Sequence, residues 1–428
     1  MIYHSDQNAG GADWRGSSHG LLSSGNVKLP ACVKSAFRHW TLGLLALSTM
    51  AVSLPAASEK PVLVGFDSEL TLATSTSSEA IRRGLFIAMD ELNAAGGVLG
   101  GRPLALEITD NRTVPARAVQ NLKDLAAKPD LVAVFTGKYS PVVLESVPVA
   151  NTLGLPLLDP WAAADEIVDN GAQPNFVFRL SLRDTWALEA MFRHAQERGY
   201  RKIGLLVPNS AWGRSSLKAA RLKVAGTPGI SIANVVWYNR GDSTLRSEYS
   251  ALQRAGGQAI FLIADEIEAS LLIREMAAMP VAERLPVISH WGITGGNFAK
   301  LAKTALHEVD LTVVQTYSFI GDTSAIAKEV LAKARRRFGL EDARHLDSPV
   351  GFAHAYDLMH ILAMAINKAG STDRRKIRDA LERLDTYHGL VRRYQPPFAP
   401  DRHEALGPEQ VFMARFDRDG SIVRLAPP

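Results

Sequence analysis

Short runs of β-branched and apolar residues alternate with longer amphipathic stretches from Pro61 onward. This alternation is typical of parallel sheets whose strands are joined by crossover helices. The first strand is predicted at 62–66, and Thr76 and Glu79 have the spacing of a capping box that opens the following helix. One face of that helix is apolar, and its members are Ile81, Leu85, Ala88, Met89 and Leu92. The glycine pair at 96–97 predicts its end.

This rhythm of strands and helices runs through two similar series. The first ends with a predicted strand at 155–158, and the second begins with a helix at 184–198 and ends with a strand at 286–289. We therefore predict an α/β fold of two doubly wound, Rossmann-like lobes. The expected boundaries are 58–181 plus 318–386 for lobe 1, and 182–317 plus 387–428 for lobe 2. Three tail strands, at 390–394, 411–416 and 422–425, are expected to join lobe 2.

The first 57 residues predict a leader and a secretory signal peptide. Lys34 and Arg38 precede an apolar run at 40–54, which is followed by small residues. The run is short for a bilayer core of about 30 Å, so cleavage is expected rather than anchoring, and we expect a periplasmic protein. Because signal peptides begin at a chain's start, translation is expected to begin near Val33. Cys32, the only cysteine, precedes the apolar run, so neither a lipid anchor nor a disulfide is expected.

Composition and motifs narrow the function classes. The formal net charge is only +4 and both signs are interspersed, so nucleic-acid binding gains no support. No glycine-rich phosphate loop and no metal-ligand spacing occur, and we predict no cofactor. The sequence at 16–20 matches a nucleophile elbow, but it lies in the leader without a strand-turn-helix context. We therefore expect a protein that is not an enzyme.

Several segments resemble the branched-chain amino-acid-type periplasmic binding proteins of ABC importers. The most specific is the run at 88–100, Ala-Met-Asp-Glu-Leu-Asn-Ala-Ala-Gly-Gly-Val-Leu-Gly, with Asp110 and 116–119 after it. Further matches are 137–140, 156–160, 177–179, 212–213, 369–373 and 377–381. They are spread in the family's order over nearly all of residues 60–425.

The resemblance implies a type I periplasmic binding fold, in which three crossings join the lobes and a hinge closes them around a ligand. It also implies a permease and an ATPase encoded separately. We expect a small amino-acid-like ligand, such as an amino acid, an amide or a urea-type solute, and a monomeric protein. The loops at 67–74, 136–140 and 160–163 depart from the usual patterns of relatives, which puts branched-chain specificity in doubt.

Candidate ligand-binding residues follow strands of the first lobe. Ser140 precedes Pro141 at a predicted helix start, where its hydroxyl and the free N–H groups could hold a carboxylate, or where it is an ordinary N-cap. Tyr139 and Trp161 could wall the pocket, with buried packing as the alternative. The resemblance adds the backbone groups of Ala162 and Ala163.

The second lobe offers further candidates. Trp212 occupies the position where relatives usually place a ligand-facing Tyr before Gly. Asp265 could pair with a ligand ammonium, although its spacing to Glu268 also fits a helix cap. His290 and Trp291 end the next predicted strand and could face the same opening or simply pack.

Asp67, from the first lobe, is a weaker alternative partner for an ammonium, because loop solvation also explains it. Two other functions stay open at this stage. One is a periplasmic sensor that presents its ligand to a membrane receptor, and the other is an enzyme assembled from distant residues.

Overall fold

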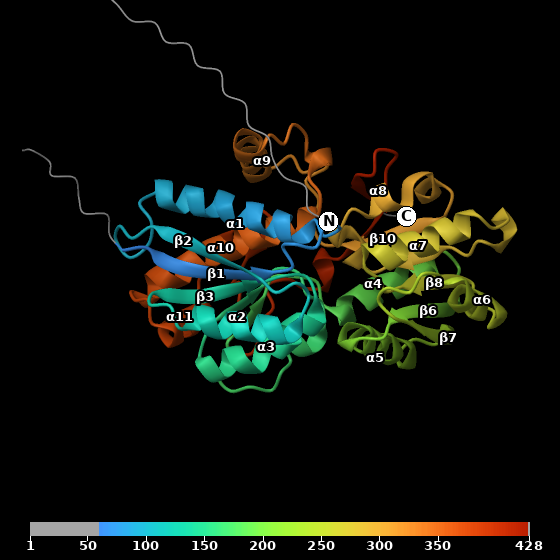
Figure 1. The fold of residues 1–428 in the computed structure, drawn as a ribbon, viewed down its shortest axis with the longest axis horizontal. Coiled ribbons are helices and arrows are strands. Elements are labelled where there is room, and N and C mark those ends of the chain that lie inside the picture. The colour runs from blue at the N-terminus through green and yellow to red at the C-terminus, as the bar shows by residue number, and fades with distance from the viewer. Residues whose placement is uncertain (1–59, 427–428) are drawn as a thin grey trace, which may run out of the picture. The chain divides into compact units, whose positions relative to one another are not determined.

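The computed structural model describes residues 60–426 (Figure 1). They belong to one compact unit. The predicted leader, the signal peptide and Cys32 lie outside the described residues. Among residues 60–426, no helix is both long enough and apolar enough to cross a membrane.

A five-stranded parallel sheet forms the first lobe. Its strand order is β2-β1-β3-β4-β5 (Figure 1). The strands are β1 (Val62–Ser68), β2 (Leu104–Asp110), β3 (Leu131–Thr136), β4 (Leu157–Asp159) and β5 (Val177–Arg179). Every residue of β3 is buried, as expected of a central strand with helices on both faces.

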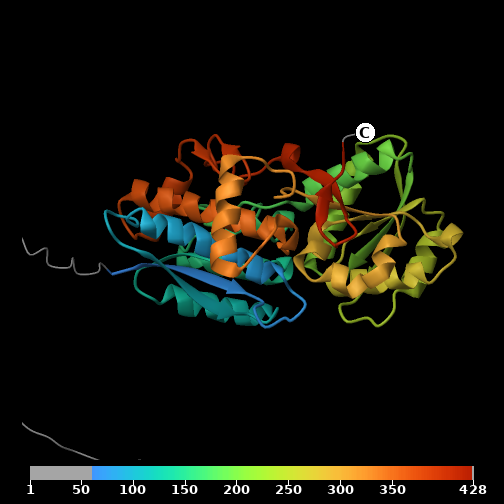
Figure 2. The same ribbon diagram turned by 90° about the horizontal axis from the view of Figure 1, so that it is seen from above.

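Helices cover both faces of this first sheet. Figures 1 and 2 show α1 (Ser77–Ala94) and α10 (Pro349–Ala369) on one face and α2 (Pro115–Ala126) and α3 (Ser140–Leu153) on the other. Two further helices, α9 (Ala325–Phe338) and α11 (Arg374–Leu381), pack against α1 and α10 respectively. The predicted apolar face of α1 is confirmed, since Ile81, Leu85, Ala88 and Met89 are buried.

The second lobe repeats the order of the first. The strand order of its sheet is β7-β6-β8-β9-β10-β13-β14. The first five strands in this order are parallel, whereas β13 is antiparallel to both of its neighbours, β10 and β14. The strands are β6 (Lys202–Pro208), β7 (Ser231–Tyr238), β8 (Ala259–Leu262), β9 (Val287–Ser289), β10 (Leu311–Gln315), β13 (Phe412–Phe416) and β14 (Ile422–Arg424). Its five parallel strands have the same order as those of the first sheet, so the predicted duplicated architecture is confirmed.

The helices of the second lobe also divide into two groups. Helices α4 (Asp184–Glu197) and α5 (Ala211–Ala225) pack together, as do α6 (Arg246–Arg254), α7 (Glu266–Ala277) and the short α8 (Phe298–Ala302). The segment at 309–317 contains β10, a strand of the second sheet. The crossing back to the first lobe follows that strand.

The tail differs from the sequence-based expectation at 390–394. The structure has a small hairpin there, β11 (Tyr387–His388) and β12 (Arg393–Tyr394), whose strands pair only with each other within the described chain. The buried carboxylate of Asp357 in α10 accepts hydrogen bonds from Leu390 N, Val391 N and Tyr394 Oη at 2.7–2.9 Å. These bonds attach the hairpin to the first lobe, whereas β13 and β14 join the second sheet as predicted.

Helices α1 and α10 approach each other closely at Gly84. A Cβ atom at this position would lie 2.2 Å from the carbonyl oxygen of Phe352. Both residues are buried in the interior of helices, so neither backbone has a loop's freedom to move aside. Glycine is therefore required for the packing of the two helices.

We predict that Gly84→Ala lowers the free energy of unfolding by about 1–3 kcal/mol, because the added methyl group forces the helices apart. Gly226→Ala is the matched control, since Gly226 is exposed, has a φ of −95° and would place its Cβ 3.9 Å from its nearest neighbour. Urea titration of both variants measures the difference. Equal stability of the two variants would contradict the packing argument.

Candidate functional site

A cavity of about 120 Å³ lies where the carboxyl ends of the strands of both sheets face each other. Its walls are loops and helix starts that follow β3 and β4 of the first lobe and β6 to β9 of the second. In doubly wound sheets this edge is where ligands bind. A larger hollow of about 280 Å³ beside Arg344 and Asp419 does not face these strand ends.

The cavity collects most of the residues that the sequence predicted. Seven of the nine predicted residues line it, and they are Tyr139, Ser140, Trp161, Ala163, Trp212, Asp265 and Trp291. Ala162 is fully buried beside the cavity and does not line it. Asp67 is not part of the cavity either.

Asp67 stabilises the first lobe. Its carboxylate accepts hydrogen bonds from Thr109, Asn111 and Asn121 at 2.7–2.8 Å. Burial raises the pKa of Asp67 to about 6, although these three bonds oppose the rise. The side chain thus ties β1 to the segment after β2 and to α2, which is a structural role.

The N–H groups that the sequence assigned to a ligand carboxylate bond to this protein's own side chains. Asp159 Oδ1 accepts from Trp161 N at 2.9 Å and from Ala162 N at 2.7 Å. Ser140 Oγ accepts from the N–H groups of Ala163 and of the next residue, both at 3.2 Å. Ser140 is the first residue of α3 and Tyr139 is its N-cap, so the alternative of an N-cap at Ser140 is wrong.

Tryptophan side chains from both lobes form the apolar walls. The rings of Trp161 and Trp291 lie 5.2 Å apart between centroids, one from each lobe. Trp212 is held by its indole N–H, which donates to buried Asp184 at 3.1 Å. His290 packs behind Trp212 and its Nε2 lies 3.2 Å from the same carboxylate, so it supports the wall without lining the cavity.

Asp265 is the one predicted ammonium partner that reaches the cavity. The alternative of a helix cap is wrong, because its side chain makes no capping hydrogen bond at the start of α7. The carboxylate is partly exposed to the cavity, yet protein atoms surround it, and this burial raises its pKa while Lys138 opposes the rise.

The sequence analysis missed the two cations of the cavity, Lys138 and Arg240. Lys138 Nζ reaches across the lobes to Glu266 Oε2 at 2.6 Å and to the carbonyl oxygen of Gly295 at 3.1 Å. Arg240 donates across the lobes to Tyr139 Oη at 2.6 Å and lies 4.4 Å from the centre of that ring. Lys138 and Arg240 each lie two residues after the end of a strand, β3 and β7 respectively. Their position after a strand end was the signal that could have identified them.

The pair of Lys138 and Glu266 is almost completely buried, with 1% of each side chain exposed. Burial by itself lowers the pKa of Lys138, but the neighbouring groups Tyr139, Glu266 and Asp265 raise it above its usual value. Lys138 is thus an ammonium cation in the closed protein, and its pair with Glu266 joins the two lobes.

Backbone hydrogen bonds join the lobes beside this ion pair. Thr76 N donates to Gly295 O at 3.0 Å, and Asn297 N donates to Thr74 O at 2.9 Å. A Cβ atom on Gly296, between them, would lie 2.2 Å from the carboxyl carbon of Glu266. The same Cβ atom would lie 2.6 Å from Thr74 O of the first lobe, so the two lobes meet here with no room for a side chain, and this arrangement is the closed form.

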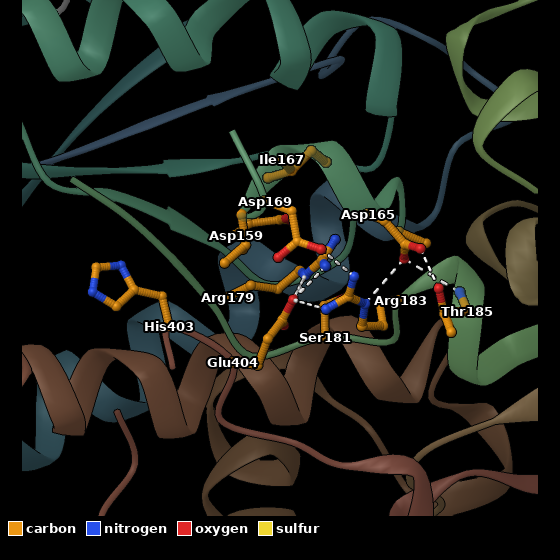
Figure 3. Close-up of polar contacts among 12 residues, drawn as sticks. Asp159, Asp165, Ile167, Asp169, Arg179, Ser181, Arg183, Thr185, His403 and Glu404 are labelled. Carbon is orange, nitrogen blue, oxygen red and sulfur yellow. Dashed lines mark hydrogen bonds and ion pairs between the residues drawn. The ribbon is translucent and has the colours of Figure 1, made fainter. Parts of the chain in front are cut away.

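Arg179 organises the opposite, hinge side of the cavity (Figure 3). Its guanidinium is fully buried and bonds Glu404 with both Nε and Nη2, at 2.9 Å and 2.5 Å. Its Nη1 donates to the carbonyl oxygens of Ala162 and Ala164 at 3.2 Å and 2.8 Å. One side chain thus joins the loop that follows β4 to two crossing segments, the one that leads from β5 to α4 and the one that leads from β12 to β13.

The two crossing segments are also paired through their backbones. Arg179 N donates to His403 O at 2.8 Å, and Ala405 N donates to Arg179 O at 2.9 Å. Figure 3 shows Arg183 next to Arg179, with its guanidinium between Asp165 and Asp169. The ion pairs therefore continue along the hinge.

Nearby Asp159 is completely buried and has one oxygen without a hydrogen-bond partner among the described residues. Burial raises the pKa of Asp159 to about 7, and the charge of Arg179 limits the rise. Within residues 60–426, no three His, Cys, Asp or Glu side chains gather in a way that could hold a metal ion.

Two doubly wound lobes, three crossings and a closed cavity between opposing strand ends define a type I periplasmic solute-binding protein. The chain belongs to the periplasmic binding protein family, which matches residues 61–421. Within it the chain is of the branched-chain amino-acid transporter type. Membership implies a location in the periplasm or outside the cell.

Individual relatives are distant. A Leu/Ile/Val-binding protein homolog 1 from Brucella abortus is 26% identical over 328 residues, which are 75% of this chain and 82% of that protein. A type 1 periplasmic binding protein from Bordetella pertussis superposes with a TM-score of 0.76 at 22% identity, covering 86% of this chain and 100% of that one. The substrate-binding protein LivJ from Streptococcus pneumoniae, in complex with isoleucine, gives 0.71 at 21% identity over 85% and 98% of the two chains. At these identities the structures show the fold.

We predict that Arg179→Met lowers the free energy of unfolding by about 3–5 kcal/mol, because it leaves buried Glu404 with only a longer ion pair to Arg183, at 3.7 Å. Lys218→Met is the matched control, since it breaks the exposed pair with Glu166 and costs about 0–1 kcal/mol. Urea titration compares the two variants. A loss of less than about 1 kcal/mol in Arg179→Met would contradict the role of this side chain.

We also predict that Lys138→Met shifts the protein towards an open form, because closure then buries Glu266 without a partner. Small-angle scattering should show a larger radius of gyration. The double variant Lys138→Met, Glu266→Gln should return towards the wild-type value, and Lys128→Met, which breaks an exposed pair with Glu107, should not differ from it. An unchanged radius in Lys138→Met would show that this pair does not hold the lobes closed.

Proposed function

We propose that the protein is the solute-binding component of an ABC importer and captures one small, amino-acid-like solute in the cavity between its lobes. The observation that carries this proposal is the carboxylate of Asp265, which faces the cavity beyond the carboxyl ends of both sheets and makes no hydrogen bond among the described residues. Lys138 and Arg240 lie near it but bond to other groups. An anion in such a place needs a positive partner, and a ligand ammonium supplies one.

The size of the cavity supports a small solute. An apolar protein cavity of about 150 Å³ holds one benzene molecule, so a cavity of about 120 Å³ suits a ligand of similar size. A solved relative, LivJ from Streptococcus pneumoniae, was determined in complex with the small solute isoleucine. Amino acids, their amides and related amines are therefore the solutes to test first.

Closure completes the binding site. The walls come from both lobes, and the pairs of Lys138 with Glu266 and of Arg240 with Tyr139 form only when the lobes meet. A solute that contacts both lobes stabilises the closed form through its differential affinity for it. We propose that a permease with its ATPase accepts this closed, monomeric form, and that the solute leaves chemically unchanged.

The test is calorimetry with the mature protein and a panel of amino acids, amino-acid amides and amines. We predict that Asp265→Asn weakens binding of the best ligand about 10- to 100-fold, because the buried ammonium loses its counter-charge. Asp385→Asn is the control, since that carboxylate is 91% exposed and lies outside the cavity. Unchanged affinity in Asp265→Asn, or no binding of any solute by the wild type, would refute the proposal.

The proposed pair of Asp265 with a ligand ammonium predicts how binding depends on pH. Burial raises the pKa of Asp265, so its carboxylate becomes protonated nearer to neutral pH than an ordinary one. A protonated carboxyl cannot pair with an ammonium, so affinity should fall as the pH is lowered from about 8 to about 6. Asp265→Asn should show a flat profile over this range. The opposite slope would argue against an ammonium at this position.

A further inference from the structure

The cavity carries more negative than positive charge. Its positive groups are Lys138 and Arg240, and its negative groups are Asp265, Glu268 and, directly behind the wall, Glu266. When all are ionised, one negative charge has no counterpart. Glu266 Oε1 also has no hydrogen-bond partner among the described residues, so no hydrogen bond to this atom offsets the excess negative charge.

The positive groups are already engaged with this protein's own atoms. Lys138 uses two of its three N–H donors on Glu266 and Gly295. A ligand carboxylate that drew Lys138 away would leave the fully buried Glu266 without a cation, which is costly. Arg240 is bonded to Tyr139 and lies against its ring, with the charges of Asp265 and Glu268 close by.

The polar donors of the first-lobe wall are likewise occupied. Asp159 and Ser140 accept the N–H groups of the four residues at 161–164. In the first turn of α3, Pro141 has no N–H, and the N–H groups of Val142 and Val143 bond to the Tyr139 carbonyl. On the first-lobe wall, a carboxylate would therefore find few of the free donors that a carboxylate site requires.

The remaining surface of the cavity suits an organic cation. Five aromatic side chains line it, Tyr139, Trp161, Trp212, Tyr238 and Trp291. Aromatic faces attract cations through the ring quadrupole and at the same time pack well against carbon atoms. Together with the carboxylate of Asp265, which makes no hydrogen bond among the described residues, they form a site for a positive group attached to an apolar body.

We propose that the solute is a small amine cation without a free carboxylate. Its ammonium pairs with Asp265, and its carbon skeleton packs against the tryptophan walls. This inference rests on the proposed function and narrows its ligand class, since an α-amino acid would bring a carboxylate into a cavity that already has a surplus of negative charge.

The experiment compares four probes that share one branched skeleton, by calorimetry with the full mature chain. The probes are 3-methylbutylamine, 3-methylbutan-1-ol, L-leucine and 4-methylpentanoate. We expect the amine to bind at least about 10-fold more tightly than leucine, and the carboxylate to bind least, because of the charge balance of the cavity. In Asp265→Asn, the amine should lose its advantage over the neutral alcohol, whereas Asp385→Asn should keep it.

The outcomes separate this inference from the proposed function. Leucine binding as tightly as the amine, or more tightly, would overturn the inference, while a loss of leucine binding in Asp265→Asn would still support the proposed function. Tighter binding of 4-methylpentanoate would also overturn it and would point to Arg240 as the main ligand contact. If none of these probes and no solute of the wider panel binds, both proposals fail.

Discussion

The buried guanidinium of Arg179 is the interaction on which the hinge side of the molecule depends. It neutralises Glu404 and lies beside Asp159, so it balances carboxylates from two segments that are more than 200 residues apart in the chain. It also holds the carbonyl groups of the loop after β4, which carries Trp161. The position of one cavity wall is thereby fixed to the axis about which the lobes move. A change at the hinge should therefore alter the position of this cavity wall, because Arg179 bonds both to Glu404 and to the loop that carries Trp161.

Much of the fold could be predicted because its elements follow simple periodic patterns. The alternation of short apolar strands and amphipathic helices identified both sheets, and the strand ends identified the cavity. The errors concern interactions between distant residues. Asp357 was part of an ordinary helical pattern, and nothing in the sequence showed that it would accept hydrogen bonds from the hairpin at 387–394. Thr76 had the spacing of a cap, but its hydroxyl lies against Ser348 instead.

In the candidate site, too, single residues at strand ends could be predicted, whereas contacts between distant residues could not. Aromatic residues after strand ends could be named as candidates, because ligands of doubly wound sheets bind beyond the carboxyl ends of the strands. Lys138 and Arg240 were missed because a charged residue in a loop is usually solvated, and only the meeting of two lobes buries Lys138 and pairs Arg240 with Tyr139. Conversely, Asp67 was counted as a ligand contact, although three polar neighbours from β2, the loop after it and α2 already surround it. Sequence identifies which groups are present, whereas the pairing among them is a property of the closed structure.

The route of the chain between the lobes has a consequence for biosynthesis. Helix α10, which covers one face of the first sheet, begins at Pro349, and the counter-ion of Arg179 is Glu404. Strand β13, which extends the second sheet, comes later still. Neither lobe can therefore be completed while the last quarter of the chain is still on the ribosome, although nascent domains usually fold in order from the N-terminus. A chain built in this way remains unfinished until synthesis ends, and an unfinished chain is the form that can be threaded through a narrow export channel.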